Sequence, residues 1–138
     1  MLRILVIDES GEDSRHTKAV LEAQGMQVMT VFSAEQGIET ARRCIPDIIF
    51  TDVVLPGISG FQATRLLKMD SQTKNIPVII MSNRAQEYNI TWGLRQGAQT
   101  YLIKPVSADA LLKSIYNALP PHHSASPVLA AMEVKSIN

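Results

Sequence analysis

The chain lacks several features that would place it in a specialised class of protein. It contains one cysteine, Cys44, so no internal disulfide can form and nothing indicates an oxidising compartment. Its 13 basic and 13 acidic side chains cancel to a formal net charge of zero. This balance argues against binding of nucleic acid or an anionic membrane through a general basic field. The N-terminal apolar run from Ile4 to Ile7 is too short for a signal-peptide core or a membrane span, so we expect a soluble cytoplasmic protein.

The length and hydrophobic content are typical of one ordinary domain. The chain has 138 residues, of which 46% are hydrophobic. A domain of about 150 residues buries roughly 70% of the surface that its unfolded chain exposes. The core therefore needs neither a disulfide nor a metal ion to hold it together.

Short apolar runs alternate with segments of helical periodicity along most of the chain. The runs predict strands at Leu2 to Ile7, Gln27 to Phe32, Asp47 to Thr51, Pro77 to Met81 and Thr100 to Ile103. Successive parallel strands need crossover connections, which helices provide, and strands that are nearly all apolar fit a sheet covered on both faces. The pattern predicts a doubly wound α/β fold with a five-stranded parallel sheet, in the common strand order 2-1-3-4-5, and five helices.

Capping and terminating residues mark the ends of several predicted helices. Ser10 and Asp13 have the spacing of a capping box at the start of the first helix, and Gly25 stands where that helix should end. Gly97 has the same place after Glu87 to Gln96, which we expect to be the fourth helix.

The last 19 residues, from Pro120, depart from the alternating pattern and hold three of the seven prolines. We expect residues 1–119 to form the domain and residues 120–138 a tail. The tail is either disordered or contains a short helix over Pro127 to Val134, and the sequence leaves both open. A tail of this length is too short for a DNA-binding or catalytic output domain, so output is expected through protein contacts.

Polar residues follow the predicted strands, where an open parallel sheet binds its ligands. They are Asp8 and Glu9 after the first strand, Asp52 after the third, Ser82 after the fourth, and Lys104 with Pro105 after the fifth. Neighbouring strands lie about 4.8 Å apart, so the acids of the first and third strands can face one pocket. Lys104 has the long side chain that can bridge the gap to Asp52.

Three carboxylates in one pocket repel each other. Two unit charges about 4 Å apart repel by about 4 kcal/mol at an effective dielectric constant of about 20. A divalent cation relieves this repulsion, and an oxygen-only ligand set with room for water suits Mg²⁺. The chemistry indicated is phosphoryl transfer to a carboxylate, with metal and ammonium neutralising the transferred group.

Four pieces of sequence at these strand ends carry a family resemblance. They are Val6 to Glu9, Ile49 to Pro56 with Gly60, Met81-Ser82, and Tyr101 to Pro105. As an ordered set they resemble the CheY-like receiver domain of two-component response regulators, from Arg3 to about Leu119. The resemblance implies a signalling protein rather than an enzyme, and the flavodoxin-like fold of that family.

The resemblance also implies a role for each residue at the strand ends. Asp52 would accept a phosphoryl group from a sensor histidine kinase or its phosphotransfer domain. Asp8 and Glu9, with Asp52 and the backbone carbonyl of Val54, would hold Mg²⁺.

Further roles concern the fourth and fifth strands. Ser82 and Lys104 would contact the phosphoryl oxygens, Ser82 and Tyr101 would form the switch, and the peptide bond between Lys104 and Pro105 would be cis. A downstream protein would then bind the fourth helix, fifth strand and fifth helix.

A second group of strings lies mostly on the third and fourth predicted helices. It comprises Gly60 to Arg65, Asn75 to Ile79, Gln86-Glu87 and Trp92 to Ala98. These strings are similar to the PilH-type single-domain regulators of the bacterial chemosensory system that controls type IV pili and twitching motility. We expect such a protein to be a monomer or weak dimer that binds no nucleic acid and does not insert into the membrane.

Some positions depart from the pattern of most receivers. Glu9 replaces the usual Asp, and Asn83 replaces a residue that is usually small. A receiver-fold binding module with a disabled pocket, which acts without phosphorylation, therefore remains an alternative. Val54 and Arg84, two residues after Asp52 and Ser82, occupy positions that in the family tune how fast water attacks the phosphorylated aspartate. Neither residue is an evident base, so self-hydrolysis of the phosphorylated form is expected to be slow.

Overall fold

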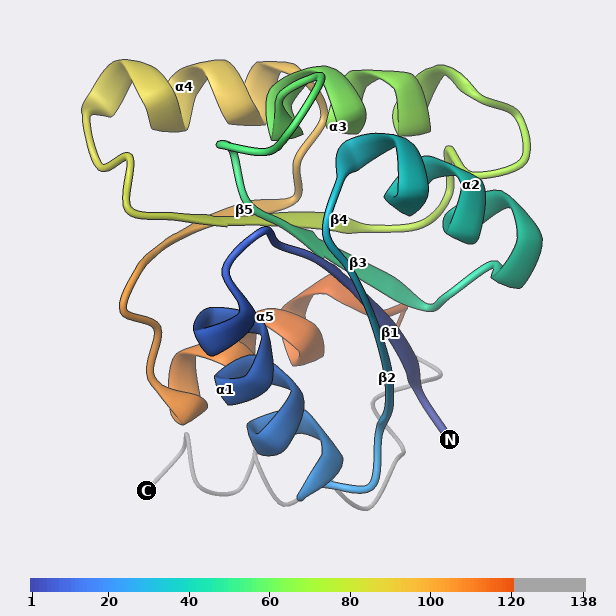
Figure 1. Ribbon diagram of the computed structural model, residues 1–138, viewed down its shortest axis with the longest axis vertical. Helices are drawn as coiled ribbons and strands as arrows, with labels where there is room; N and C mark the ends of the chain where they lie inside the picture. Colours follow the sequence, from blue (N-terminus) through green and yellow to red (C-terminus); the bar gives the residue numbers. More distant parts are fainter. Residues whose placement is uncertain (121–138) are drawn as a thin grey trace.

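The computed structural model describes residues 1–120 as a three-layer α/β domain (Figure 1). The five strands form one parallel sheet in the order β2-β1-β3-β4-β5. They are β1 (Arg3–Ile7), β2 (Gln27–Val31), β3 (Ile48–Thr51), β4 (Val78–Ser82) and β5 (Thr100–Ile103). The predicted fold and strand order are confirmed, and each strand end differs from the predicted one by no more than one residue.

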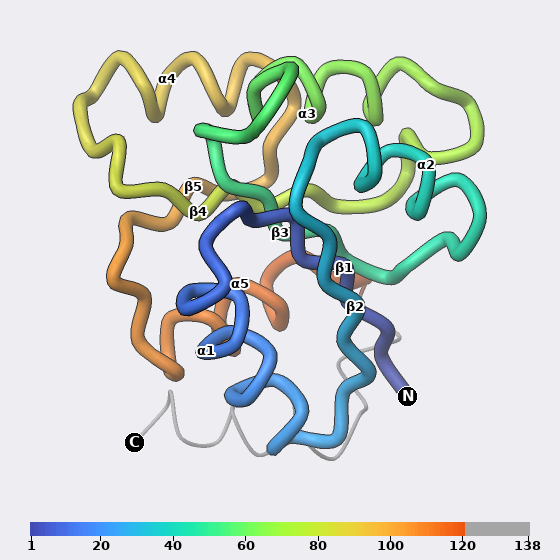
Figure 2. The backbone as a smooth tube through the Cα atoms, in the orientation of Figure 1, coloured from blue at the N-terminus to red at the C-terminus, as the bar shows by residue number. Residues whose placement is uncertain are grey.

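Five helices cover both faces of the sheet, and the first four of them connect successive strands. They are α1 (Gly11–Glu22), α2 (Ala34–Cys44), α3 (Gly60–Met69), α4 (Glu87–Arg95) and α5 (Ala108–Ala118). Helices α1 and α5 lie on one face, below the sheet in Figure 1, and α2, α3 and α4 lie on the other. The backbone trace in Figure 2 shows the chain running outward from β1 to β2 and then returning past β1 to β3, β4 and β5.

The alternation of side chains along the strands builds a core on each face. Ile4 and Val6 of β1 pack in the cluster that includes Leu21 of α1 and Leu111 of α5. Their neighbours in sequence point to the other face, where a second cluster joins β1 to α2 and α3. Period-two alternation in a strand therefore accounts for both apolar layers, and it explains why β1 is apolar throughout.

The predicted start of α1 needs a correction. Ser10 caps the helix as expected, because its side chain accepts a hydrogen bond from the backbone N–H of Asp13. The reciprocal half of the predicted capping box is absent, since the backbone N–H of Ser10 donates to Asp8 at 2.9 Å. The Asp13 carboxylate instead contacts Lys104. Asp8 thus accepts the hydrogen bond that Asp13 would accept in a capping box, and the Asp13 carboxylate accepts one from Lys104 instead.

Two further predictions concern membrane spans and the tail. Within residues 1–120, no helix is long and apolar enough to cross a lipid bilayer. The predicted tail from Pro120, including the alternative helix over Pro127 to Val134, lies almost entirely outside the described residues.

Candidate phosphoryl-acceptor site

The carboxyl edge of the sheet brings residues from four strand ends together. In the register of the sheet, Ile7 at the end of β1 lies opposite Thr51 at the end of β3. The residues that follow, Asp8 and Asp52, therefore leave the sheet side by side, and the Asp52 N–H donates to the carbonyl of Ile7 at 2.9 Å. On the other side of β4, Ser82 pairs with Ile103, which places Lys104 just beyond the same edge.

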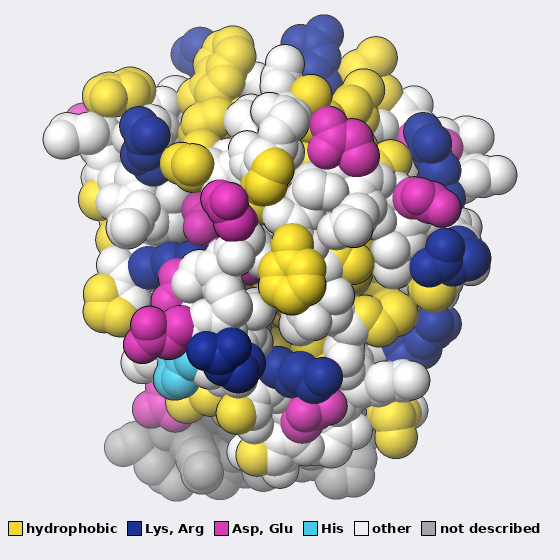
Figure 3. Space-filling model, viewed as in Figure 1, with side chains coloured by type: hydrophobic (Ala, Val, Ile, Leu, Met, Phe, Trp, Pro, Cys, Tyr) yellow, Lys and Arg dark blue, Asp and Glu magenta, His cyan; other side chains and the backbone are white. Residues whose placement is uncertain are grey.

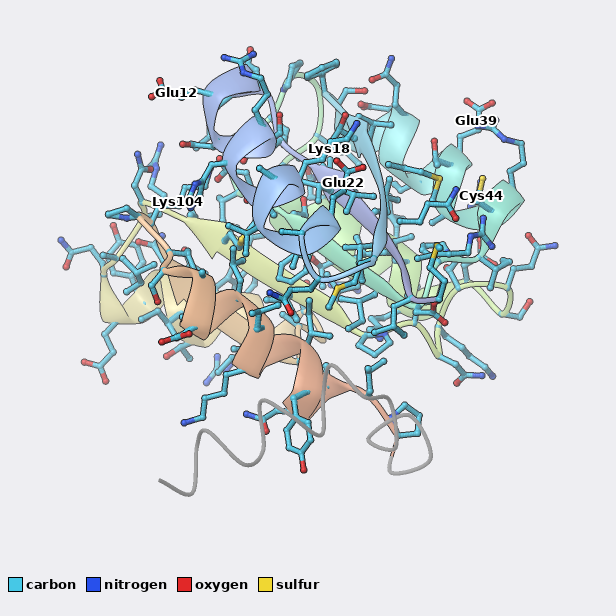
Figure 4. The ribbon with its side chains drawn as sticks, turned by 90° about the horizontal axis from the view of Figure 1, so that it is seen from below. Glu12, Lys18, Glu22, Glu39, Cys44 and Lys104 are labelled. Atoms are coloured by element: carbon cyan, nitrogen blue, oxygen red, sulfur yellow. The ribbon has the colours of Figure 1, made fainter. Side chains whose placement is uncertain are left out.

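The Lys104 ammonium is the centre of this site. Its Nζ lies 2.7 Å from an oxygen of Asp8, 2.9 Å from one of Asp13 and 3.0 Å from one of Asp52. An ammonium has three N–H donors, so each carboxylate receives one charge-assisted hydrogen bond. In the view of Figure 4, Lys104 lies beside the first turn of α1, and in Figure 3 acidic side chains gather over that end of the helix.

Backbone hydrogen bonds orient two of the three carboxylates. Asp8 accepts from the Ser10 N–H through Oδ1 and from Lys104 through Oδ2. Asp52 likewise accepts from the Val53 N–H at 2.6 Å through Oδ1 and from Lys104 through Oδ2. Both side chains are therefore held in place before any ligand arrives.

The charges in the site are unevenly buried. The side chain of Asp8 is 2% exposed and that of Lys104 13%, whereas that of Asp13 is 47% exposed. Burial raises the pKa of Asp8 above its ordinary value, although its hydrogen bond to Lys104 acts in the opposite direction. Burial also opposes the charged form of Lys104, but its three carboxylate partners outweigh this and raise the pKa of the ammonium. The hydrogen bond to Lys104 lowers the pKa of Asp13.

Gly60, at the start of α3, packs directly against the backbone of Asp52. Its N–H donates to the carbonyl of Val53 at 2.8 Å. A Cβ atom at this position would lie 1.8 Å from the carbonyl oxygen of Asp52, which is far inside contact distance. A glycine is therefore required for the loop after β3 to return to the helix at this place.

Ser82 and Tyr101 lie on neighbouring strands beside the charged cluster. Ser82 is fully buried and its Oγ accepts from the backbone N–H of Arg84 at 3.1 Å. The Tyr101 hydroxyl donates to the carbonyl of the same Arg84 at 2.6 Å. Burial raises the pKa of Tyr101, while hydrogen bonding with Ser82 acts against this rise. Both side chains thus hydrogen-bond to the backbone of Arg84, which lies in the connection between β4 and α4.

The structure places the other predicted site residues less centrally. Glu9 is exposed, and none of the ion pairs found within residues 1–120 includes it. The side chain of Val54 is 47% exposed. The peptide bond between Lys104 and Pro105 is cis.

Asp13 is the site residue that the sequence analysis did not select. It lies in a helix rather than at a strand end, so a search confined to strand ends passes over it. The available signal was an acid in the first turn of the helix that begins three residues after Asp8, beside the pocket.

The acidic residues of the site fit a divalent cation. Within the described part of the chain, no three His, Cys, Asp or Glu side chains form a metal-binding cluster. Mg²⁺ nevertheless needs only one or two carboxylates, because it keeps several waters. Three carboxylates and one ammonium leave a formal charge of −2 in the site. This excess of charge and the raised pKa of buried Asp8 fit a hard divalent cation beside Asp8 and Asp52.

Comparisons with known proteins agree with this geometry. Residues 4–116 match the family described as the response regulator receiver domain. The chain is 45% identical to the protein PilH of Pseudomonas aeruginosa over 115 residues, which are 83% of this chain and 95% of PilH. Several other curated response regulators are longer, and the chain spans 23% to 50% of their length.

Solved structures show the same fold. The chemotaxis response regulator CheY4 of Vibrio cholerae matches with a TM-score of 0.80 and 26% identity, over 86% of this chain and 99% of CheY4. The receiver domain of a sensor histidine kinase from Pseudomonas aeruginosa PAO1 matches with a TM-score of 0.78 and 25% identity, over 84% of this chain and 95% of that one. That structure has a magnesium ion coordinated in the active-site cleft.

Proposed function

Because the chain belongs to the response regulator receiver family, we propose that it is a phosphorylation switch whose acceptor is Asp52. The observation that carries the proposal is the Lys104 ammonium, which lies within 3.0 Å of both Asp8 and Asp52 at the carboxyl edge of the sheet. A histidine kinase or its phosphotransfer domain supplies the phosphoryl group. In the transfer, an oxygen of Asp52 forms a bond to phosphorus, the bond from phosphorus to the histidine nitrogen breaks, and its electron pair stays on the imidazole.

Each residue of the site has a part in this proposal. Asp52 is held by the Val53 N–H, which leaves its second oxygen directed at Lys104 and available to attack. Lys104 and Ser82 bind the phosphoryl oxygens, which lowers the cost of charge developing on the transferred group.

A metal ion belongs to the same proposal. Asp8 and Asp52, with Glu9 and the backbone carbonyl of Val54, would hold Mg²⁺, whose charge offsets that of the phosphoryl oxygens. Asp8 is the best placed of these residues, because it is buried and its carboxylate is already oriented by the Ser10 N–H.

The proposed output surface is formed by α4, β5 and α5. Tyr101 of β5 is hydrogen-bonded to Arg84 in the connection to α4, so a movement of Ser82 toward a phosphoryl group changes the packing of that connection. On α4, Tyr88 and Trp92 are 71% and 50% exposed. Exposed aromatic side chains of this kind are common anchors of protein interfaces.

The biological role is proposed from the similarity to PilH. We propose that the protein acts in the bacterial cytoplasm, in control of type IV pilus twitching motility or in chemosensory signalling. Neither Val54 nor Arg84 provides a base near the acceptor, which supports a slow self-hydrolysis of the phosphorylated form.

Phosphorylation of the purified protein by acetyl phosphate tests the proposal. We expect one phosphoryl group per chain by intact-mass spectrometry, dependent on Mg²⁺, and loss of all incorporation in Asp52→Asn. Asp109→Asn is the matched control, because Asp109 is an exposed acid in the first turn of α5. Incorporation that persists in Asp52→Asn contradicts the proposal.

The exposure of Glu9 favours a second candidate function. If neither Glu9 nor its neighbours retain the metal, the protein is a binding module with the receiver fold that acts without phosphorylation. This alternative predicts no Mg²⁺ binding at millimolar concentration and an output that Asp52→Ala leaves unchanged.

A further inference from the structure

Asp13 makes a contact with the pocket that its position in the sequence does not indicate. It lies in the first turn of α1, where its backbone N–H donates to Ser10 Oγ at 3.2 Å. Its carboxylate extends away from the helix to Lys104, with 2.9 Å between Oδ2 and Nζ. Asp13 therefore belongs both to a helix cap and to the charged cluster.

The contact with Asp13 completes the hydrogen bonding of Lys104. The ammonium can donate three hydrogen bonds. Asp8, Asp13 and Asp52 accept at 2.7, 2.9 and 3.0 Å. Before Lys104 can bind a phosphoryl oxygen, one of these three partners must give up its hydrogen bond.

The three partners differ in how readily they can release Lys104. Asp8 is buried, so release would leave a carboxylate without its counter-charge away from water. Asp52 is the proposed acceptor and its side chain is 14% exposed. The side chain of Asp13 is 47% exposed, so water can solvate its carboxylate as soon as Lys104 leaves. Asp13 is the partner whose release costs least.

We infer that Asp13 is a positioning residue that competes with the incoming phosphoryl group for the Lys104 ammonium, and so weakens the binding of the phosphodonor. This inference rests on the proposed function of Asp52 as acceptor. In the unphosphorylated protein Asp13 holds one N–H of Lys104. When a dianionic donor enters, that N–H donates to a phosphoryl oxygen instead, and the Asp13 carboxylate accepts hydrogen bonds from water.

The neighbouring residue Glu12 provides a matched control. Glu12 and Asp13 are both acids in the first turn of α1. In the view of Figure 4, Glu12 projects outward from the helix and away from Lys104. None of the hydrogen bonds or ion pairs reported for residues 1–120 joins Glu12 to Lys104. Asp13→Asn and Glu12→Gln remove the same charge from the same helical turn, but only Asp13→Asn removes a charge that is paired with Lys104.

The test is the rate of phosphorylation by acetyl phosphate at saturating Mg²⁺, measured over a range of acetyl phosphate concentrations. It gives a limiting rate constant, written here as kcat, and a half-saturating acetyl phosphate concentration, written as KM. We expect Asp13→Asn to lower KM about fivefold and to change kcat by less than about twofold, as is reasonable for loss of one half-exposed ionic contact. Glu12→Gln is expected to change either constant by less than about twofold, because its charge is solvated. Asp13→Glu keeps the carboxylate, and its KM should lie closer to that of the wild type.

A readout without phosphodonor separates this inference from the proposed function. Exchange of the Lys104 Nζ protons with water, followed by ¹⁵N NMR, should be faster in Asp13→Asn than in the wild type and unchanged in Glu12→Gln. Asp13→Ser serves as a second variant that retains a residue suited to the first helical turn, and thermal unfolding confirms that each variant is folded.

The possible results are distinguishable. If the wild type is phosphorylated and Asp13→Asn has the same KM as Glu12→Gln, this inference is overturned and the proposed function stands. Unchanged exchange at Lys104 in both Asp13→Asn and Asp13→Ser overturns it as well. If the wild type takes up no phosphoryl group with Mg²⁺, the proposed function fails and this inference fails with it.

Discussion

Lys104 and Lys68 are two partly buried lysines in opposite surroundings. Lys104, at the carboxyl edge of the sheet, contacts three carboxylates, which raise the pKa of its ammonium despite its burial. Lys68, near the end of α3, donates to the backbone carbonyls of Lys74 at 3.2 Å and Ile76 at 2.5 Å. Burial lowers the pKa of Lys68.

The difference shows how the sheet edge makes a lysine chemically useful. Both ammonium groups lose hydration, but only Lys104 meets acids that compensate for it, from the carboxyl ends of β1 and β3 and from the first turn of α1. Lys68 meets the neutral carbonyls of the connection between α3 and β4, and its stem lies beneath Gly97, where an added Cβ would be 2.8 Å from its Cγ. Lys68 therefore closes a loop, whereas Lys104 is poised to bind an anion.

Replacement of each lysine by methionine should give the largest difference between the two sites, measured as the loss in free energy of unfolding. Lys104→Met leaves Asp8 buried without its counter-charge, and we expect a loss of about 2–4 kcal/mol in the free energy of unfolding. Lys68→Met loses hydrogen bonds to carbonyls but also removes a poorly hydrated charge, and we expect a loss of about 1 kcal/mol or less. Urea unfolding measures both losses.

Lys113 on α5 supplies the reference for that experiment, because it is exposed. Lys113→Met should leave the free energy of unfolding within about 0.5 kcal/mol of the wild type. Equal losses in Lys104→Met and Lys68→Met would remove the distinction between the two sites.

Addition of Mg²⁺ should affect only the acidic site. A ligand that binds the folded protein alone stabilises it by about 1.4 kcal/mol at ten times its dissociation constant. We expect this increase in the wild type and in Lys68→Met, and its loss in Asp8→Asn. Thermal unfolding with and without MgCl₂, at ionic strength matched with NaCl, gives the measurement. An equal Mg²⁺ response in Asp8→Asn would show that the cation binds elsewhere.

Alkaline pH should change the free energy of unfolding in opposite directions through the two lysines, by less than the changes expected above. The pKa of Lys68 is lowered from 10.5, so just below that value the unfolded chain binds more protons and stability rises with pH. The pKa of Lys104 is raised above 10.5, so its contribution to stability is complete below that value and is lost as the pH rises toward the folded pKa.

The measurement is the difference in free energy of unfolding between the wild type and each methionine variant, between about pH 9 and pH 11. The difference should grow with pH for Lys68→Met and shrink above about pH 10.5 for Lys104→Met. Parallel curves for the two variants would contradict the opposite pKa shifts.

Much of the site could be located from the sequence because strand ends are easy to recognise. Asp8, Asp52 and Lys104 each directly follow a strand, and the sheet order then brings them to one edge. The same reasoning included Glu9, which the structure leaves exposed. Adjacent residues at a strand end point in different directions, so two acids in sequence do not ensure two acids in a pocket.

Other features depended on long-range packing. The capping box predicted at Ser10 and Asp13 is incomplete, while Ser59 and Gln62 form a complete one at the start of α3. Ile45 ends α2 with a φ of 45°, a conformation that usually favours glycine and that no local pattern indicated. Local signals compete with tertiary contacts at such positions, and the tertiary contacts decide.

The sequence by itself determined the five strands, the five helices and the acids and lysine that follow the strands, because periodicity and chain connectivity are local properties. Only the tertiary structure decided which charges meet. Asp13 and Lys104 are 91 residues apart in sequence, and they meet because α1 packs below the sheet with its first turn beside the end of β5. Contact between charges depends on distances of a few ångströms that arise only when the helices have packed on the sheet.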